Sequence, residues 1–178
     1  SYVETDEVGP VTVYGKTKLH GEEQVKANTD KYYIFRTAWL YGVGGNNFVK
    51  TMTKLGSTRD EINVVSDQHG SPTYAKDLTE IIYQAIKKNI PFGIYNATNE
   101  GYTTWYEFTK EILAEQGIEC KVNPVTTEEY IEMMKITQAK RPFNSQMSKA
   151  KLEACGIKIP DWKDGLRRYL EEARELEK

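Results

Sequence analysis

The chain of 178 residues has little cysteine and little histidine, with two of each. Cys120 and Cys155 are far apart, so they form neither a disulfide framework nor a CxxC metal pair. His20 and His69 have no carboxylate or cysteine at metal-ligand spacing. We therefore expect no metal site, and the sparse cysteine favours a reduced, cytoplasmic protein.

Long apolar runs and an excess of positive charge are missing as well. No apolar stretch approaches the ~18 residues that would span a membrane. Twenty-four Lys and Arg residues against 26 Asp and Glu give a net charge of −2, so nucleic-acid binding has no electrostatic support. With 39% apolar and 28% charged residues, the composition is typical of a globular domain, and neither nucleic acid nor membrane is an expected partner.

Short apolar segments alternate with helical patterns along the first hundred residues. Strands are expected at 31–37, 62–65, 92–97 and 120–125. Helices are expected from Val11, after Asn47 and Thr73 as N-caps, from a Thr104/Glu107 capping box, at 127–134, after Ser148, and over 162–176. This order predicts an α/β fold with a parallel sheet.

A glycine-rich phosphate turn is also missing. Nothing matches GxGxxG or GxxGxxG, with which a doubly wound sheet normally begins. The chain also opens without Met. We expect the C-terminal portion of a longer protein, which alone would bind a dinucleotide poorly and be inactive.

Tyr14 and Lys18 stand at positions i and i+4 of the first expected helix, on one face. An unperturbed tyrosine titrates near ~10, and a neighbouring ammonium favours the phenolate. Such a pair can donate a proton to a carbonyl oxygen as hydride reaches the carbon. The spacing alone is weak evidence, because Tyr83/Lys87 and Tyr106/Lys110 repeat it, and packing of a ring beside a solvated lysine explains those two.

Several motifs in a fixed order surround this pair. They are YGKTK at 14–18, FRTAWLYG at 35–42, NNFV at 46–49, DQHGSPTYA at 67–75 and RPFNS at 141–145. Together they resemble the extended short-chain dehydrogenases/reductases, and most of all the branch that reduces a dTDP-linked 4-keto deoxysugar. The resemblance covers nearly the whole chain.

The resemblance implies a Rossmann-like doubly wound parallel sheet with a smaller α/β substrate-binding region. Residues 1–65 would complete the dinucleotide-binding domain and 66–178 would mainly bind substrate, with the segments interleaved. Its cofactor would be NADPH or NADH, and hydride would be transferred to C4 of dTDP-4-dehydro-L-rhamnose. Apolar faces around Ile81 and Leu166 leave a homodimer and a simple core equally open.

The resemblance also implies roles for six residues. Tyr14 is the proton donor, and Lys18 is its partner on the cofactor ribose. Trp39 lies against the deoxysugar, Gln68 and Thr73 are polar substrate contacts, and Arg141 faces the diphosphate. Core packing for Trp39, a loop and helix-cap role for Gln68 and Thr73, and a surface ion pair for Arg141 remain alternatives.

Two other functions remain open. Another nucleotide-sugar reductase, epimerase or dehydratase of the same family would share Tyr14 and Lys18. A non-catalytic relative is the second, because the same fold resembles the regulatory β subunit of methionine adenosyltransferase.

Overall fold

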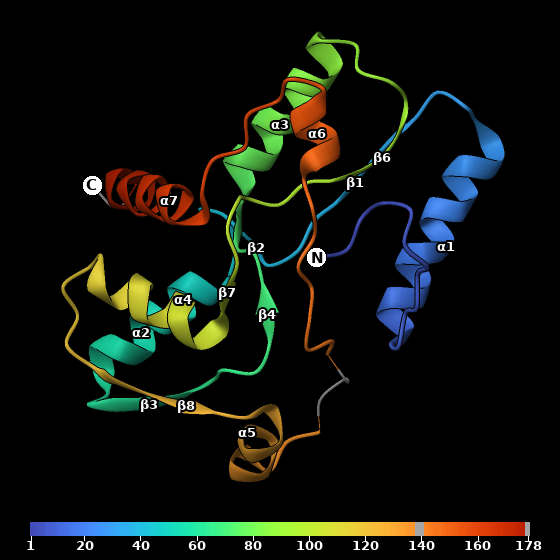
Figure 1. Ribbon diagram of the computed structural model, residues 1–178. Coiled ribbons are helices and arrows are strands. Elements are labelled where there is room, and N and C mark those ends of the chain that lie inside the picture. The colour runs from blue at the N-terminus through green and yellow to red at the C-terminus, as the bar shows by residue number, and fades with distance from the viewer. Residues whose placement is uncertain (138–140, 177–178) are drawn as a thin grey trace.

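The computed structural model describes residues 1–137 and 141–176 (Figure 1). Helices and short strands alternate along the chain. The helices are α1 Val13–Asn28, α2 Phe48–Thr58, α3 Ala75–Lys87, α4 Trp105–Ala114, α5 Thr127–Met134, α6 Ala150–Ala154 and α7 Trp162–Leu176. The strands are β1 Tyr33–Arg36, β2 Leu40–Tyr41, β3 Glu61–Val65, β4 His69–Gly70, β5 Thr73–Tyr74, β6 Gly93–Asn96, β7 Thr103–Thr104 and β8 Lys121–Val125.

The strands pair mainly in parallel. β1 pairs with β6, β2 with β5, and β3 with β8 in parallel, whereas β4 and β7 are antiparallel. Parallel partners need long crossover connections, and α3 runs between β5 and β6 while α4 runs between β7 and β8. The predicted α/β fold with parallel strands is therefore confirmed.

Aromatic and aliphatic side chains form the core beneath these strands. One cluster gathers around Tyr41, Phe108 and Leu166, and a second around Ile81 and Tyr95. Ile81 and Leu166 are thus buried inside the chain itself, at 2% and 0% exposure. The apolar faces around these two residues pack in the core of the same chain.

An ion pair joins α7 to α3. The Arg168 guanidinium donates to both carboxylate oxygens of the buried Asp77, at 2.6 and 2.8 Å. Asn99 donates a third hydrogen bond to Asp77 at 2.7 Å. The buried carboxylate is thereby satisfied, which fixes the last helix against the body of the fold.

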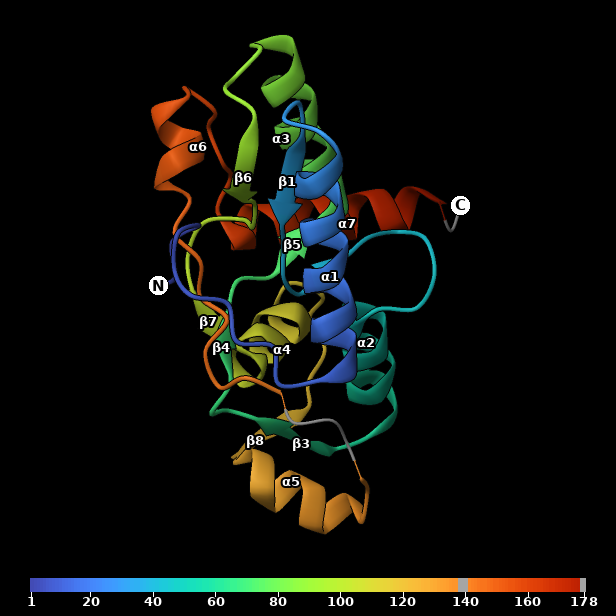
Figure 2. The same ribbon diagram turned by 90° about the vertical axis from the view of Figure 1, so that its right-hand side faces the viewer.

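Helix α1 lies along one side of the molecule, as Figures 1 and 2 show. It begins where the Thr12 side chain accepts a hydrogen bond from the backbone N–H of Gly15. None of its residues is buried in the described chain. Its position therefore depends on few contacts, and these are described below.

Two expected helix caps are wrong. Thr73 belongs to strand β5, and α3 begins after Tyr74 without a side-chain cap. Thr73 is fully buried, because its backbone pairs with β2 and draws the side chain into the fold. Helix α6 begins after Lys149 rather than Ser148, also without a side-chain cap. Asn47 does cap α2, by accepting from the N–H of Lys50 at 3.0 Å.

None of the helices in the described ranges is long and apolar enough to cross a bilayer.

Candidate functional site

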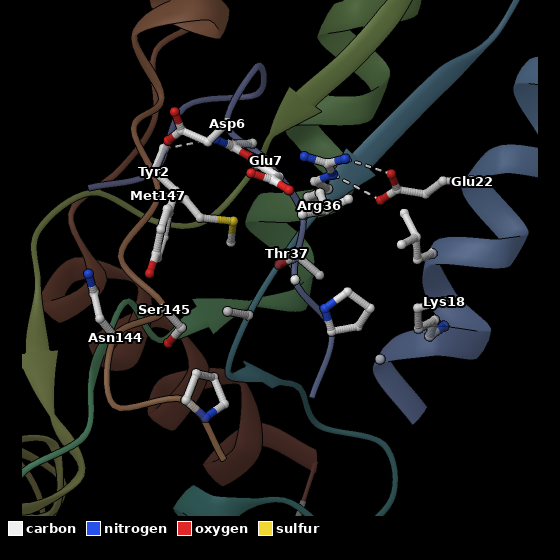
Figure 3. A pocket seen from close by; sticks show the side chains of 18 of the residues that line it. Tyr2, Asp6, Glu7, Lys18, Glu22, Arg36, Thr37, Asn144, Ser145 and Met147 are labelled. Atoms are coloured by element: carbon white, nitrogen blue, oxygen red, sulfur yellow. Dashed lines mark hydrogen bonds and ion pairs between the residues drawn. The ribbon is translucent and has the colours of Figure 1, made fainter. Parts of the chain in front are cut away.

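A cleft of about 540 Å³ opens between α1, the carboxyl end of β1 and two irregular segments. Lys18 and Glu22 reach it from α1, and Arg36 and Thr37 from the end of β1. Figure 3 shows that Asn144, Ser145 and Met147 face these residues from the opposite side. Ligands of parallel α/β folds bind outside the carboxyl ends of strands, so the cleft is a candidate binding site.

The Tyr14/Lys18 pair has the geometry that its spacing predicts. Lys18 Nζ lies 5.6 Å from the centre of the Tyr14 ring, and Tyr14 is 72% exposed. The pairs Tyr83/Lys87 and Tyr106/Lys110 are alike, at 5.6 and 5.0 Å. Lys18 lines the cleft at α1, whereas the other two lysines line neither of the clefts described here. The Tyr14/Lys18 pair therefore differs from the other two pairs in the position of Lys18 at a cleft and not in the geometry of the pair.

A bidentate ion pair ties α1 to β1. Arg36 donates from Nε and Nη2 to the two carboxylate oxygens of Glu22, at 2.9 and 2.7 Å. The hydrogen bond that Arg36 donates to Glu22 raises the pKa of Arg36, against an opposing contribution from burial. Glu22 lies one helical turn after Lys18, on the same face. The ion pair thus orients that face toward the cleft.

A second cleft, of about 410 Å³, brings together Gln68 and Arg141. Phe48, Trp105 and Tyr130 supply aromatic walls to it, and Asn63 adds a further amide. Aromatic faces, amides and a guanidinium in one concave site suit a ligand with a planar ring and an anionic group.

Gln68 is 5% exposed and joins two elements. Its Oε1 accepts from Trp105 Nε1 at 3.2 Å, and its Nε2 donates to Thr127 Oγ1 at 3.0 Å. Thr127 Oγ1 in turn donates to Asp67 at 2.7 Å. Gln68 therefore orders the wall of the second cleft as well as lining it.

Trp39 lies between the two clefts. Its ring stacks on Trp105 with centroids 3.6 Å apart and planes 13° from parallel, and Trp105 lines the second cleft. Its chain neighbour Ala38 lines the first cleft. The Thr73 backbone N–H donates to the Trp39 carbonyl at 3.1 Å, so the buried Thr73 contacts Trp39 through its backbone.

The structure thus places five of the six predicted residues in two clefts or in the region that joins them, whereas Tyr14 lines neither cleft. Lys18 lines the first cleft, Gln68 and Arg141 line the second, and Trp39 and Thr73 lie together between the two. Tyr14 projects from the same helix face as Lys18 but is largely exposed.

Sequence reasoning missed Trp105 and the Arg36–Glu22 ion pair. Trp105 lies between the two residues of the expected Thr104/Glu107 capping box, and its contact with Trp39 joins segments sixty-six positions apart. A lone tryptophan beside a capping threonine gives no signal of such a partner. Arg36 and Glu22 both lie inside or beside the quoted motifs, which was the available signal.

Lys18 gives the first cleft a hydrogen-bond donor that fits the ribose of a dinucleotide cofactor. The Lys18 ammonium lies at the cleft wall, where ribose hydroxyls could accept from it. Within the part of the chain that the structure describes, no group of three or more His, Cys, Asp or Glu side chains is arranged to hold a metal ion.

A family model described as the RmlD substrate binding domain matches residues 1–175. The chain belongs to the RmlD substrate-binding domain family. The motif-based resemblance is thereby confirmed, and the motifs from YGKTK to RPFNS all fall within the matched residues.

The chain is also similar to individual proteins and solved structures. The chain is 45% identical over 171 residues to a Bacillus subtilis protein named spore coat polysaccharide biosynthesis protein SpsK, covering 96% of the chain and 58% of that protein. A dTDP-4-dehydrorhamnose reductase structure from Clostridium acetobutylicum matches with a TM-score of 0.90 at 45% identity, over 97% of the chain and 60% of that structure.

A third match shows a cofactor in a relative. The dTDP-4-dehydrorhamnose reductase of Bacillus anthracis, solved in complex with NADP, matches with a TM-score of 0.87 at 42% identity, over 96% of the chain and 59% of that structure. The chain spans about three fifths of the length of the relatives it matches.

Proposed function

We propose that the complete protein reduces the C4 keto group of dTDP-4-dehydro-L-rhamnose to give dTDP-L-rhamnose. The placement of Lys18, beside Tyr14 and on the wall of the larger cleft, carries this proposal. The named relatives support the substrate, and the NADP complex of one of them supports a nicotinamide cofactor. Either NADPH or NADH is compatible with the residues of this chain.

Tyr14 and Lys18 handle the proton in this reaction. The bound nicotinamide cofactor supplies the hydride. Tyr14 donates its phenolic proton to the oxygen at C4 as negative charge develops there. The Lys18 ammonium stabilises the resulting phenolate and donates hydrogen bonds to the ribose hydroxyls. Both residues lie on the same face of α1, as their i, i+4 spacing requires.

The remaining residues would bind the nucleotide sugar. Trp39, between the two clefts, offers an aromatic face to the deoxysugar. Arg141 in the second cleft offers a guanidinium fork to the diphosphate, and Gln68 an amide to the nucleotide. Thr73 is buried, so its contribution is to hold the Trp39 backbone through its N–H.

The test compares Tyr14→Phe with Tyr83→Phe and Tyr106→Phe in the complete protein. All three tyrosines have a lysine four residues later at a similar ring distance, so the two control variants match the chemistry of the change. We expect only Tyr14→Phe to lose about 10²- to 10⁴-fold in kcat, the usual contribution of a general acid, while it retains binding of the nucleotide sugar. Near-normal turnover by Tyr14→Phe would refute the mechanism.

The substrate is tested with dTDP-, UDP- and GDP-linked 4-keto sugars assayed side by side, each with NADPH and with NADH. Turnover of the dTDP sugar alone supports the proposal. Turnover of a UDP or GDP sugar instead would identify the protein as a different nucleotide-sugar enzyme of the same family. Binding of a partner protein without any turnover would identify a regulatory relative.

A further inference from the structure

The pair Trp39 and Trp105 differs from the other aromatic contacts of the fold. Its centroid distance of 3.6 Å is shorter than that of any other ring pair measured in the described residues. Nearly parallel rings at this distance cover one whole face of each other. Only the opposite face of Trp39 is left for a ligand.

The backbone of Trp39 is strained. Its φ of 50° lies in the left-handed region, which bulky residues rarely adopt. Such a strained conformation persists only when surrounding contacts hold it. Thr73 N–H holds the carbonyl, and a Cβ at Gly70 would come within 2.8 Å of the Trp39 ring. Trp105 supplies the third constraint, on the ring face.

Trp105 is itself oriented by a directional chain of hydrogen bonds. An indole N–H can only donate, so Gln68 must present its oxygen to Trp105 and its nitrogen to Thr127. Thr127 then donates its hydroxyl proton to the Asp67 carboxylate. The donors and acceptors at each step are thus fixed by the neighbouring group, and this series of hydrogen bonds ends at the Asp67 carboxylate.

We propose that Trp105 is a positioning residue for Trp39, and that the Gln68–Thr127–Asp67 chain fixes the Trp105 ring so that Trp39 presents a single face to the sugar. This inference rests on the proposed function only for the identity of the ligand. The stack and the hydrogen-bond chain are properties of the protein before any ligand binds.

Thr127 offers a test that leaves both tryptophans in place. The side-chain hydrogen bonds of Thr127 go to Gln68 and Asp67, and Thr127 does not line the second cleft, so we expect its effect on Trp105 to pass through Gln68. Two stacked indoles give an exciton couplet in circular dichroism. We expect Thr127→Val to weaken this couplet in the complete protein, and Thr127→Ser, which keeps the hydroxyl, to retain it. Trp162→Phe is the control that should leave the couplet intact. An unchanged couplet in Thr127→Val would overturn the role of the chain.

Kinetics with Trp39→Leu, Trp105→Leu and the double variant test whether Trp105 affects sugar binding through Trp39. We expect Trp105→Leu to raise the KM for the nucleotide sugar by about two- to tenfold, the range that an aromatic pair contributes, without changing the KM for the cofactor. In the Trp39→Leu background the same change should have no further effect.

The outcomes separate this inference from the proposed function. If Trp39→Leu itself leaves the kinetics unchanged, the sugar contact in the proposed function fails. If Trp39→Leu raises KM but Trp105→Leu does not, or if the two effects are additive, the positioning role fails. Should Trp105→Leu not fold, Trp105→Phe repeats the test: it retains a ring on Trp39 and loses the bond to Gln68, so a rise in the sugar KM that disappears in the Trp39→Leu background supports the inference and an unchanged or additive KM overturns it.

Discussion

The position of α1 depends on the ion pair between Glu22 and Arg36. Neither side chain is more than about a fifth exposed, at 18% and 19%, and the helix buries none of its own residues. We predict that Glu22→Gln loosens α1 while the rest of the fold keeps its stability. The change removes the charge of the carboxylate but leaves a side chain of the same size.

The magnitude follows from geometry and exposure. An exposed ion pair contributes about 0–1 kcal/mol, and breaking a fully buried one costs about 3–5 kcal/mol. The Glu22–Arg36 pair is bidentate and partly buried, so we expect a loss of about 2 kcal/mol, in the range of hydrogen bonds to charged groups. At 1.4 kcal/mol per factor of ten, the opening equilibrium of α1 should rise by about 30-fold.

Amide hydrogen exchange measures this opening residue by residue. Protection along α1 should fall in Glu22→Gln, while helix α3, which buries Asp77, Ile81 and Ala85, serves as an internal reference. Glu23→Gln is the matched control, because the Glu23 side chain is 55% exposed and its carboxylate lies 3.8 Å from His20 Nδ1. Unchanged protection of α1 in Glu22→Gln, or an equal loss in Glu23→Gln, would refute the reasoning.

Three further changes test the core and the site. Tyr41→Phe should stabilise the protein by about 1 kcal/mol in thermal unfolding, because the Tyr41 hydroxyl is buried without a hydrogen-bond partner among the described residues; a lower melting temperature would contradict this. Burial raises the pKa of Tyr95 to about 12, so the folded state holds this proton more tightly than the unfolded one. The stability that the neutral phenol contributes should be complete below about pH 10 and fall between about pH 10 and 12. Denaturant titrations at several pH values should show the free energy of unfolding decreasing over this range, and Tyr95→Phe should reduce that decrease. Gly70→Ala should displace the Trp39 ring, since the added Cβ would lie 2.8 Å from it, and raise the KM for the nucleotide sugar; an unaltered KM would show that the ring can shift without consequence.

Local patterns were sufficient to predict most of the regular elements. The side chain of Asn47 and the apolar spacing after it predict α2, and the run at 31–37 predicts β1 as a parallel strand. The same run predicts a buried strand, whereas the residues of β1 are only partly buried. Four strands were not predicted, namely β2, β4, β5 and β7. Each has two residues, which is too short for an alternation to be visible. Thr73 shows the consequence, since its place before an apolar helix predicts an N-cap, whereas it lies in a strand of two residues.

The candidate site, too, could be predicted only where local sequence patterns determine it. Tyr14 and Lys18 follow from a local spacing, and the helix brings them together as predicted. Gln68 and Arg141 reach one cleft only through the fold, because they are far apart in the chain. The stacking of Trp39 on Trp105 depends on the pairing of β4 with β7, which brings Gly70 opposite Thr103 near the start of α4. Such contacts are set by tertiary structure, and a single sequence carries no local trace of them.

The parallel pairing of the strands has a consequence for synthesis. Tyr33 pairs with Gly93 and Glu61 with Lys121, so in both cases the partners are sixty residues apart. At a translation rate of about 5–20 residues per second, β1 and β3 each wait about 3–12 seconds for the strand that completes them. During that time neither strand has the partner that it pairs with in the folded structure. These two pairings therefore cannot be completed until β8 has been synthesised.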